Sequence, residues 1–421
     1  MSRREILRNV PLRALLVAEI VSTTGSQMTW LALPWFVLTT TGSPVRMTFV
    51  MIAELVGATA AGLPAGVLLQ RLGARRTMLG ADALRAPLML LVPILHWTGH
   101  LSFVALLALA VSLGAFFAPY FSAQRVIVPE LLGEDESVVT HANALFQGAI
   151  RATLLLGPPL GGVLIGVIGA PSVLLVDGAS YLVSFALVAL FVPRRAPGHS
   201  EEGERGLLTG LRFLFHEPLL RVWIPLFVAG DAAWQTFFAA VPVLVVERFH
   251  ADPKIAGILF AGFGAGALVG NLASFRFLTQ RVEGLRLVAL SVPFQALPLW
   301  VLPLHVGPAV LTCAIFASGI ANGVCNPTIH SIFTLRMPPA IRAKAMTANM
   351  TVWGLGMPLG LIVAGPVLAT YGARPVLIAF AAVQTATMLG VAAAALRARM
   401  PTHAAQSDVP LATVSVSDSL P

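Results

Sequence analysis

The amino-acid sequence predicts an all-α integral membrane protein with about twelve transmembrane helices. Of its 421 residues, 57% are hydrophobic and 11% are charged, which is more apolar surface than a soluble domain of this length can bury. Apolar runs such as 101–120 and 376–396 recur along the chain, and a helix needs about 20 such residues to cross hydrocarbon. The runs are continuous, whereas the strands of a membrane barrel alternate over about ten residues.

Charges and Gly/Pro clusters interrupt the apolar runs, and each segment between two interruptions is a predicted helix. The predicted helices cover residues 11–40, 46–69, 77–96, 101–128, 138–168, 171–192, 217–247, 254–279, 285–304, 307–335, 342–370 and 374–397.

The basic residues predict how the helices are oriented in the membrane. Most of them fall in loops on one side of the membrane, and the loops on the other side hold Arg46, Arg248, Lys254 and Arg374. The positive-inside rule therefore places both termini in the cytoplasm, in a plasma or inner membrane. The use of arginine instead of lysine is typical of a GC-rich bacterial genome. The loops on the predicted cytoplasmic side hold Arg71, Arg75, Arg76, Arg194, Arg195, Arg205, Arg212, Arg276, Arg281, Arg286, Arg336, Arg342 and Lys344.

The formal charge of +8 does not indicate a nucleic-acid partner, because the basic residues are short clusters between apolar runs. No cofactor or metal site is expected either. The two cysteines, Cys313 and Cys325, lie in one apolar run and suit neither a metal site nor a disulfide framework. The expected partners are the lipid bilayer, a small-molecule substrate and protons.

The chain divides into two predicted six-helix bundles, 1–192 and 217–399, with a charged cytoplasmic linker at 193–216 and a disordered tail at 400–421. Residues recur between the halves: Gln27 and Pro34 precede Gln235 and Pro242 by 208 positions. Ordered recurrence indicates duplication, and transporters rock such repeats around a central site. One chain, as a monomer, could therefore contain a complete pathway.

The loop between the second and third helices reads Gly66-Val-Leu-Leu-Gln70-Arg71-Leu-Gly73-Ala-Arg75-Arg76. It resembles the cytoplasmic loop signature of the major facilitator superfamily, and the resemblance extends to about residue 399. It implies that the arginines latch an inner gate. Glutamine replaces the usual aspartate at position 70, which leaves only hydrogen bonding there. The alternative is that the arginines only set the topology.

The fifth helix contains Gly157-Pro158-Pro159-Leu-Gly161-Gly162, which is similar to the antiporter signature of the drug-efflux branches of that superfamily. The prolines kink the helix and the glycines allow a neighbouring helix to approach closely; a generic kink is the alternative reading. The stretch from Pro119 to Asn143 resembles the branch that contains enterobactin exporters and macrolide efflux pumps. These resemblances imply a drug:proton antiporter that exports its substrate.

Ionisable residues inside a membrane are costly and therefore candidate functional groups. Asp231 lies about 18 Å into the seventh helix, at 1.5 Å per residue. It shares a face with Gln235 and Phe238. The corresponding face of the first helix is the polar stripe Thr23, Gln27 and Trp30. We expect the two stripes to line a substrate cavity, although a polar contact between helices is the alternative. Further cavity candidates are Gln147, Trp234, Asn322, Asn326 and Trp353.

Other buried ionisable residues could bind the coupling proton, because burial disfavours a charged carboxylate. Asp82 and Arg85 are three residues apart and could form either a structural ion pair or a gate. Asp177 falls one or two turns from the outer surface, where hydration explains it. The proton-coupling candidates are Asp231, Glu19, Glu54, Asp82, Arg85 and Arg151.

The sequence therefore predicts a secondary active transporter that exports a small lipophilic molecule, such as a drug, siderophore or secondary metabolite, by proton-coupled alternating access. Uptake of a metabolite or translocation of lipid by the same fold are alternatives, as is a membrane sensor or scaffold. An enzyme is not expected, because no catalytic cluster is recognisable. The Gly262 to Gly270 run is interpreted as a helix-packing surface.

Overall fold

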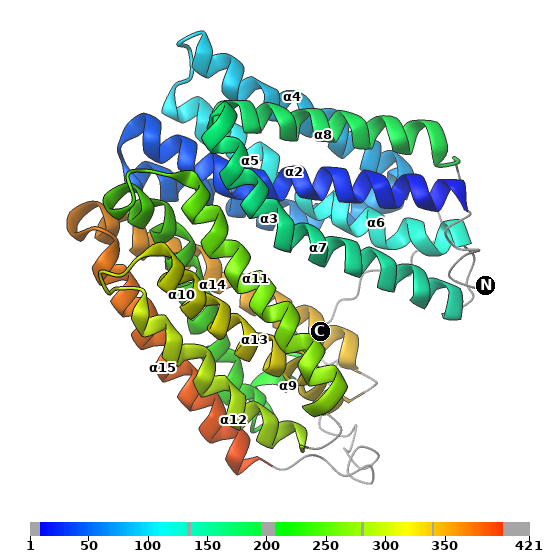
Figure 1. Ribbon diagram of the computed structural model, residues 1–421. Helices are drawn as coiled ribbons and strands as arrows, with labels where there is room; N and C mark the ends of the chain where they lie inside the picture. Colours follow the sequence, from blue (N-terminus) through cyan, green and yellow to red (C-terminus); the bar gives the residue numbers. More distant parts are fainter. Residues whose placement is uncertain (1–8, 133–135, 195–206, 279–281, 339–340, 399–421) are drawn as a thin grey trace, which may run out of the picture.

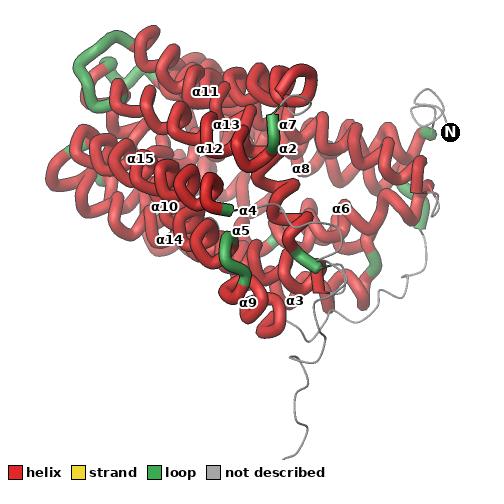
Figure 2. Tube along the Cα trace, turned by 90° about the horizontal axis from the view of Figure 1, so that it is seen from below, coloured by secondary structure: helices red, strands yellow, loops and turns green. Residues whose placement is uncertain are grey.

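The computed structural model describes residues 9–132, 136–194, 207–278, 282–338 and 341–398. These residues form helices joined by short loops, with no β-strand among them (Figures 1 and 2). Eleven helical spans are long and apolar enough to cross a membrane. Helix α2 (Val10–Thr41) is not one of these eleven, because Glu19, Thr23 and Gln27 dilute its apolar character. Its 32 residues extend about 48 Å at 1.5 Å per residue, so α2 can complete a set of twelve.

Two groups of helices make up the molecule, and they lie on either side of a gap that widens toward the chain termini (Figure 1). The amino-terminal half contains α2 (Val10–Thr41), α3 (Pro44–Leu72), α4 (Ala74–Trp97), α5 (Phe103–Ala115), α6 (Phe117–Leu132), α7 (Glu136–Ile168) and α8 (Ala170–Phe191). The carboxy-terminal half contains α9 (Leu207–His216), α10 (Leu220–Arg248), α11 (Pro253–Ala273), the π-helical turn η1 (Ser274–Leu278), α12 (Gly284–Ala296), the 3-10 turn η2 (Leu297–Val301), α13 (Pro308–Arg336), α14 (Arg342–Tyr371) and α15 (Ala373–Arg397).

The predicted helices agree with these elements in order and position. Two predicted helices are broken: 101–128 is divided into α5 and α6 at Phe116, and 285–304 ends in η2. The predicted linker 193–216 contains the short helix α9, while 195–206 and the predicted tail 400–421 lie outside the described residues. Gly169 and Gly372 both adopt positive φ, 81° and 75°. Glycine tolerates this conformation at the turns before α8 and α15.

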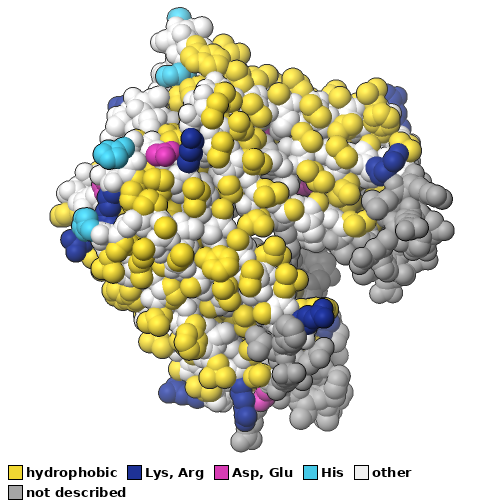
Figure 3. Space-filling model, viewed as in Figure 1, with side chains coloured by type: hydrophobic (Ala, Val, Ile, Leu, Met, Phe, Trp, Pro, Cys, Tyr) yellow, Lys and Arg dark blue, Asp and Glu magenta, His cyan; other side chains and the backbone are white. Residues whose placement is uncertain are grey.

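We call the end at which α2 begins and α15 ends the terminal end, and the other the distal end. One buried core at the distal end contains residues of both halves, including Leu33 and Val173 with Val241 and Leu377. Toward the terminal end the buried residues separate into one cluster in each half. The space-filling view shows an indentation between the halves at that end (Figure 3). The molecule is therefore closed at the distal end and opens toward the terminal end.

Large apolar side chains cover much of the outer surface (Figure 3). Phe275, Leu190 and Val104 are exposed by 83%, 76% and 76% of their surface. A surface of this kind is stable in contact with lipid tails but not with water. The assignment of the terminal end to the cytoplasm stays a prediction.

Candidate functional site

A cavity of about 120 Å³ lies within the carboxy-terminal half, which is room for several water molecules. It brings together five predicted site residues from three helices. These are Asp231 and Trp234 of α10, Asn322 and Asn326 of α13, and Trp353 of α14. Among the described residues, none forms a hydrogen bond or an ion pair with the Asp231 carboxylate. The cavity therefore contains an acidic group whose partner could be a ligand.

Several lining residues were not predicted, namely Phe227, Gln295, Cys325, Ile329, His330 and Met388. The ring of His330 packs against that of Trp353, with 5.9 Å between the ring centroids. Asn322, Asn326 and His330 are four residues apart along α13, which places them on one helix face. That spacing is the signal that could have identified His330.

An aromatic cluster lies one turn nearer the distal end than the cavity. Trp234 packs against Phe263 and Phe380, with centroid distances of 4.6 Å and 5.2 Å. Trp30 of α2 contacts Phe238 of α10 at 4.7 Å, edge to face. Trp30 and Phe238 are equivalent in the predicted repeat, so the two halves meet through related positions. Such pairs stabilise by about 0.5–1.5 kcal/mol beyond buried area.

The polar stripe of α2 is not among the residues that line this cavity, and the expectation that both stripes line the substrate cavity stays a prediction. Thr23 instead donates a hydrogen bond to Glu19, with 2.8 Å between Oγ1 and Oε1. Gln27 packs against Gly157. On α10, Gln235 is buried, with 6% of its surface exposed, and it is not a lining residue. Thr23 and Gln27 of α2 therefore contact Glu19 and α7 instead of this cavity.

Asp82 and Arg85 are both buried in α4, as expected, but they do not form a direct ion pair. Arg85 donates a hydrogen bond to the Tyr181 hydroxyl at 2.9 Å and lies over the Tyr181 ring. Asp82 accepts a hydrogen bond from Ser184 at 2.6 Å. Asp177, expected to be hydrated, is fully buried. Asp177 is buried and not hydrated because the face of α8 that carries it packs against α2 and α4.

The glycines of the helix-five motif lie where helices approach most closely. A Cβ atom on Gly161 would stand 3.1 Å from the Met28 Cα of α2. One on Gly162 would stand 2.7 Å from the carbonyl oxygen of Pro253 and 3.1 Å from the Gly257 Cα of α11. We call the backbone contact of Gly162 with Gly257 the α7–α11 seam; it joins the two halves near the distal end.

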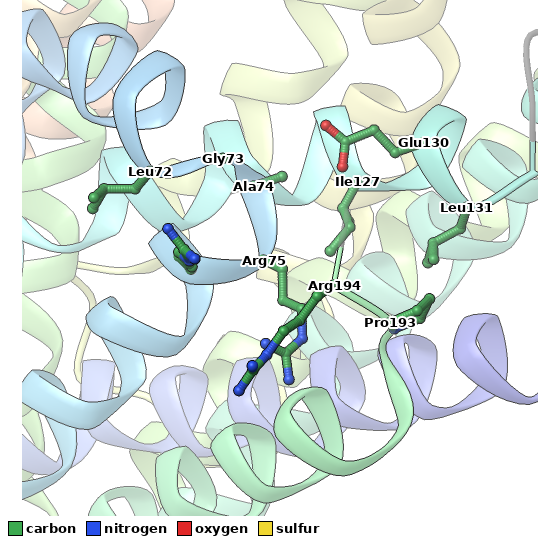
Figure 4. A pocket seen from close by; sticks show the side chains of 10 residues that line it. Leu72, Gly73, Ala74, Arg75, Ile127, Glu130, Leu131, Pro193 and Arg194 are labelled. Atoms are coloured by element: carbon green, nitrogen blue, oxygen red, sulfur yellow. The ribbon is translucent and has the colours of Figure 1, made fainter. Parts of the chain in front are cut away.

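The predicted gating loop lies at the terminal end, beside a small pocket that also contains Glu130 and Arg194 (Figure 4). Arg75 donates hydrogen bonds to the carbonyl oxygens of Val192 and Ala189, at 2.7 Å and 2.8 Å. These groups end α8, where a cation satisfies free carbonyls and opposes the helix dipole. The exposed side chains are those of Gln70, Arg71 and Arg76, and Gly73 is the turn between α3 and α4.

The remaining predicted residues do not meet at the cavity. Glu54 is half-buried in α3, near Arg85 and Asp177, and Gln147 is exposed on α7. Pro158 and Pro159 lie inside α7, where the Pro158 carbonyl faces Gly257. The side chain of Arg151 and the environment of Gly66 lie outside the described residues.

The packing interpretation of the α11 glycines is confirmed. A Cβ atom on Gly262 would stand 3.0 Å from the Thr312 side chain. One on Gly270 would stand 2.9 Å from the Ile320 carbonyl carbon of α13. These close approaches leave no room for a nucleotide, and they resemble the small-residue contacts of membrane helices.

A family model described as Major Facilitator Superfamily matches residues 15–361 and 226–419. The chain is 28% identical over 378 residues to a protein of Mycolicibacterium fortuitum named multidrug efflux pump Tap, covering 86% of this chain and 90% of the relative. A protein of the same name from Mycobacterium bovis (strain BCG / Pasteur 1173P2) is 25% identical over 385 residues, covering 88% and 90%.

Among solved structures, the nucleoside transporter NupG superposes with a TM-score of 0.73 at 13% identity, covering 92% of this chain and 99% of that one. A bacterial homologue of the human lysosomal transporter Spinster, in an inward-facing and occupied conformation, gives 0.61 at 12% identity, covering 91% and 93%. At these identities the likeness shows the fold alone.

Proposed function

The chain belongs to the Major Facilitator Superfamily and is a membrane transporter, not an enzyme, and from this premise we propose that it exports small lipophilic molecules in exchange for protons. The observation that carries the proposal is the cavity at Asp231. It combines one unpaired carboxylate with the rings of Phe227, Trp234 and Trp353. Relatives named multidrug efflux pumps support export in preference to uptake.

The chemistry of the cavity favours a substrate with an apolar body and a positive charge. Aromatic faces attract cations as well as apolar groups, and the Asp231 carboxylate adds an opposite charge. The indole Nε1 of Trp353 is buried without a hydrogen-bond partner among the described residues, so it can donate to an acceptor on the ligand. The amides of Asn322 and Asn326 can donate and accept. Drugs, siderophores and secondary metabolites with these groups are the proposed cargo.

The proposed cycle starts from the conformation described here, with the terminal end in the cytoplasm. Substrate enters from the cytoplasm or the inner leaflet and binds beside Asp231. Opening the α7–α11 seam while the terminal end closes then exposes it to the outside. A proton taken up from outside by a buried carboxylate, Asp231 or Glu19, favours release of the substrate and return of the carrier.

Accumulation of ethidium, a lipophilic fluorescent cation, tests this function in cells that express the chain. We expect lower accumulation than in cells without it, and a protonophore should abolish the difference. Asp231→Asn should abolish export because it removes the charge in the cavity. Asp252→Asn is the matched control: Asp252 is exposed at the start of α11, and asparagine also caps helices.

Two results would contradict the proposal. Unchanged accumulation of ethidium and of a panel of drugs and siderophores would argue against export of lipophilic molecules. Accumulation that is higher in expressing cells and falls with the protonophore would instead indicate uptake.

A further inference from the structure

A second cluster of ionisable side chains lies inside the amino-terminal half, outside the cavity at Asp231. It joins five helices that are packed together, and most of its members are more than nine-tenths buried. The titratable and charged groups that face one another in the described part are Glu19 of α2, Glu54 of α3, Asp82 and Arg85 of α4, Tyr120 of α6, and Asp177 and Tyr181 of α8. Four carboxyl groups therefore surround one guanidinium.

Asp177 is the carboxyl group of the cluster that accepts the most hydrogen bonds. Its carboxylate accepts hydrogen bonds from Thr29 at 2.6 Å, and from Ser180 and Tyr181 at 3.2 Å each. The Tyr181 hydroxyl that donates to Asp177 accepts from Arg85 at 2.9 Å. Hydrogen bonds from three donors favour the charged form of a carboxylate, and the Tyr181 hydroxyl links Asp177 to Arg85.

Glu19 and Asp82 have no cation of their own, because the one cation in the described part of the cluster, Arg85, acts on both of them and on Asp177. Thr23 donates to Glu19 Oε1 at 2.8 Å, and Ser184 donates to Asp82 Oδ2 at 2.6 Å. The side-chain amide of Gln124 also acts on the Glu19 carboxyl group. The second oxygens, Glu19 Oε2 and Asp82 Oδ1, are buried and have no partner among the described residues, and neither has the nearby amide nitrogen of Gln124. Glu19 and Asp82 are 5% and 0% exposed. Two additional buried negative charges are unfavourable here.

Glu54 is the least enclosed carboxyl group of the cluster, because its surface is partly exposed while Glu19 and Asp82 are buried. Glu19 and Asp82, in contrast, interact with each other electrostatically as like charges. Like charges at close range disfavour simultaneous ionisation, so such a pair holds one proton between two groups.

We infer that Glu19 and Asp82 form a proton-binding site that is separate from the substrate cavity. This inference rests on the proposed function and makes it more specific, because it assigns the exchanged proton to the amino-terminal half. The proton binds a bare oxygen of the pair and leaves from it to water. Thr23 gives a route: it bonds Glu19 and is itself half-exposed. Proton binding and substrate binding are then coupled through α2, and the proton and the substrate do not compete for Asp231.

The test is infrared difference spectroscopy of the full chain in liposomes as the pH is changed, which detects the carbonyl stretch of protonated carboxylic acids. We expect a titrating band that loses intensity in Asp82→Asn and in Glu19→Gln. The band that remains in each variant should shift its midpoint by at least about one pH unit, a tenfold change in proton affinity. The exposed control Asp252→Asn should leave this band unchanged. Should Asp82→Asn fail to fold, Glu19→Gln alone gives the same information.

Three results would overturn the inference: a band that persists in both Asp82→Asn and Glu19→Gln, a band lost only in Asp231→Asn, or a midpoint that shifts when sodium replaces choline. The last would show that the pair binds sodium. The measurement requires no transport, so absent ethidium export would refute the proposed function alone. Proton-driven export that persists in the double variant of Glu19 and Asp82 would refute this inference alone.

Discussion

The α7–α11 seam predicts that a side chain at Gly257 destabilises the distal closure. A Cβ atom there would stand 2.8 Å from the Pro158 carbonyl oxygen, 3.1 Å from the Pro159 Cα and 3.2 Å from the Gly162 Cα. These are backbone atoms, so they cannot rotate away as the end of a flexible side chain can. Gly257→Val must therefore separate α7 from α11, and with them the two halves.

The size of the effect follows from the cost of overpacking. Inserting carbon atoms into a well-packed contact typically costs about 1–3 kcal/mol. Because about 1.4 kcal/mol corresponds to a factor of ten, we expect the distally closed conformation to lose about 5- to 150-fold relative to a distally open one. If the α7–α11 seam opens during transport, the substitution destabilises only the distally closed conformation.

The assay measures the distance between spin labels on the two halves. Labels at His100→Cys and His305→Cys, in a Cys313→Ser background, lie in exposed distal loops of the two halves. Gly257→Val should add or enlarge a population at longer distance. Gly80→Ala is the matched control, because nothing lies within 4 Å of a Cβ atom at that helical position. Identical distance distributions in Gly257→Val, Gly80→Ala and the parent would refute the reasoning.

Two further predictions concern stability. Arg75→Ala removes two charge-assisted hydrogen bonds to the end of α8. We expect the free energy of unfolding to fall by about 1–3 kcal/mol, since half-exposure of the site limits the loss. A thermal unfolding temperature equal to that of the exposed Arg76→Ala control would contradict this prediction. Asp177→Ala leaves three buried hydroxyls without their acceptor, so we expect a loss of about 2–5 kcal/mol. Asp177→Asn should lose less, and equal melting temperatures of Asp177→Ala and the parent would show that the carboxylate is not structural.

The sequence predicted the order and extent of the helices because hydrocarbon imposes a simple rule. Each span needs a continuous apolar run, and charges mark its ends. The breaks at Phe116 and after Ala296 were not predicted, since neither position interrupts the apolar pattern. Helix α9 was missed for a related reason: it is only ten residues long and lies in a charged stretch.

The candidate site was predictable only in part. Asp231, Trp234 and Trp353 meet at one cavity as expected, because polar and aromatic residues deep in a membrane helix rarely face lipid. His330 belongs to the same cavity, although it was not among the predicted site residues. Depth along a helix can be read from sequence, but the face that meets a neighbour cannot.

By itself, the sequence determined that this chain spans a membrane and which residues are too polar for hydrocarbon, and it predicts that the two halves are related. Only the tertiary structure decided how those residues are paired. It linked Asp177 to Arg85 through Tyr181, left one oxygen each of Glu19 and Asp82 without a hydrogen-bond partner among the described residues, and built the Asp231 cavity from helices of the carboxy-terminal half without the α2 stripe. The physical reason is that pairing depends on helix rotation and on contacts between segments far apart in the chain, which no local pattern encodes.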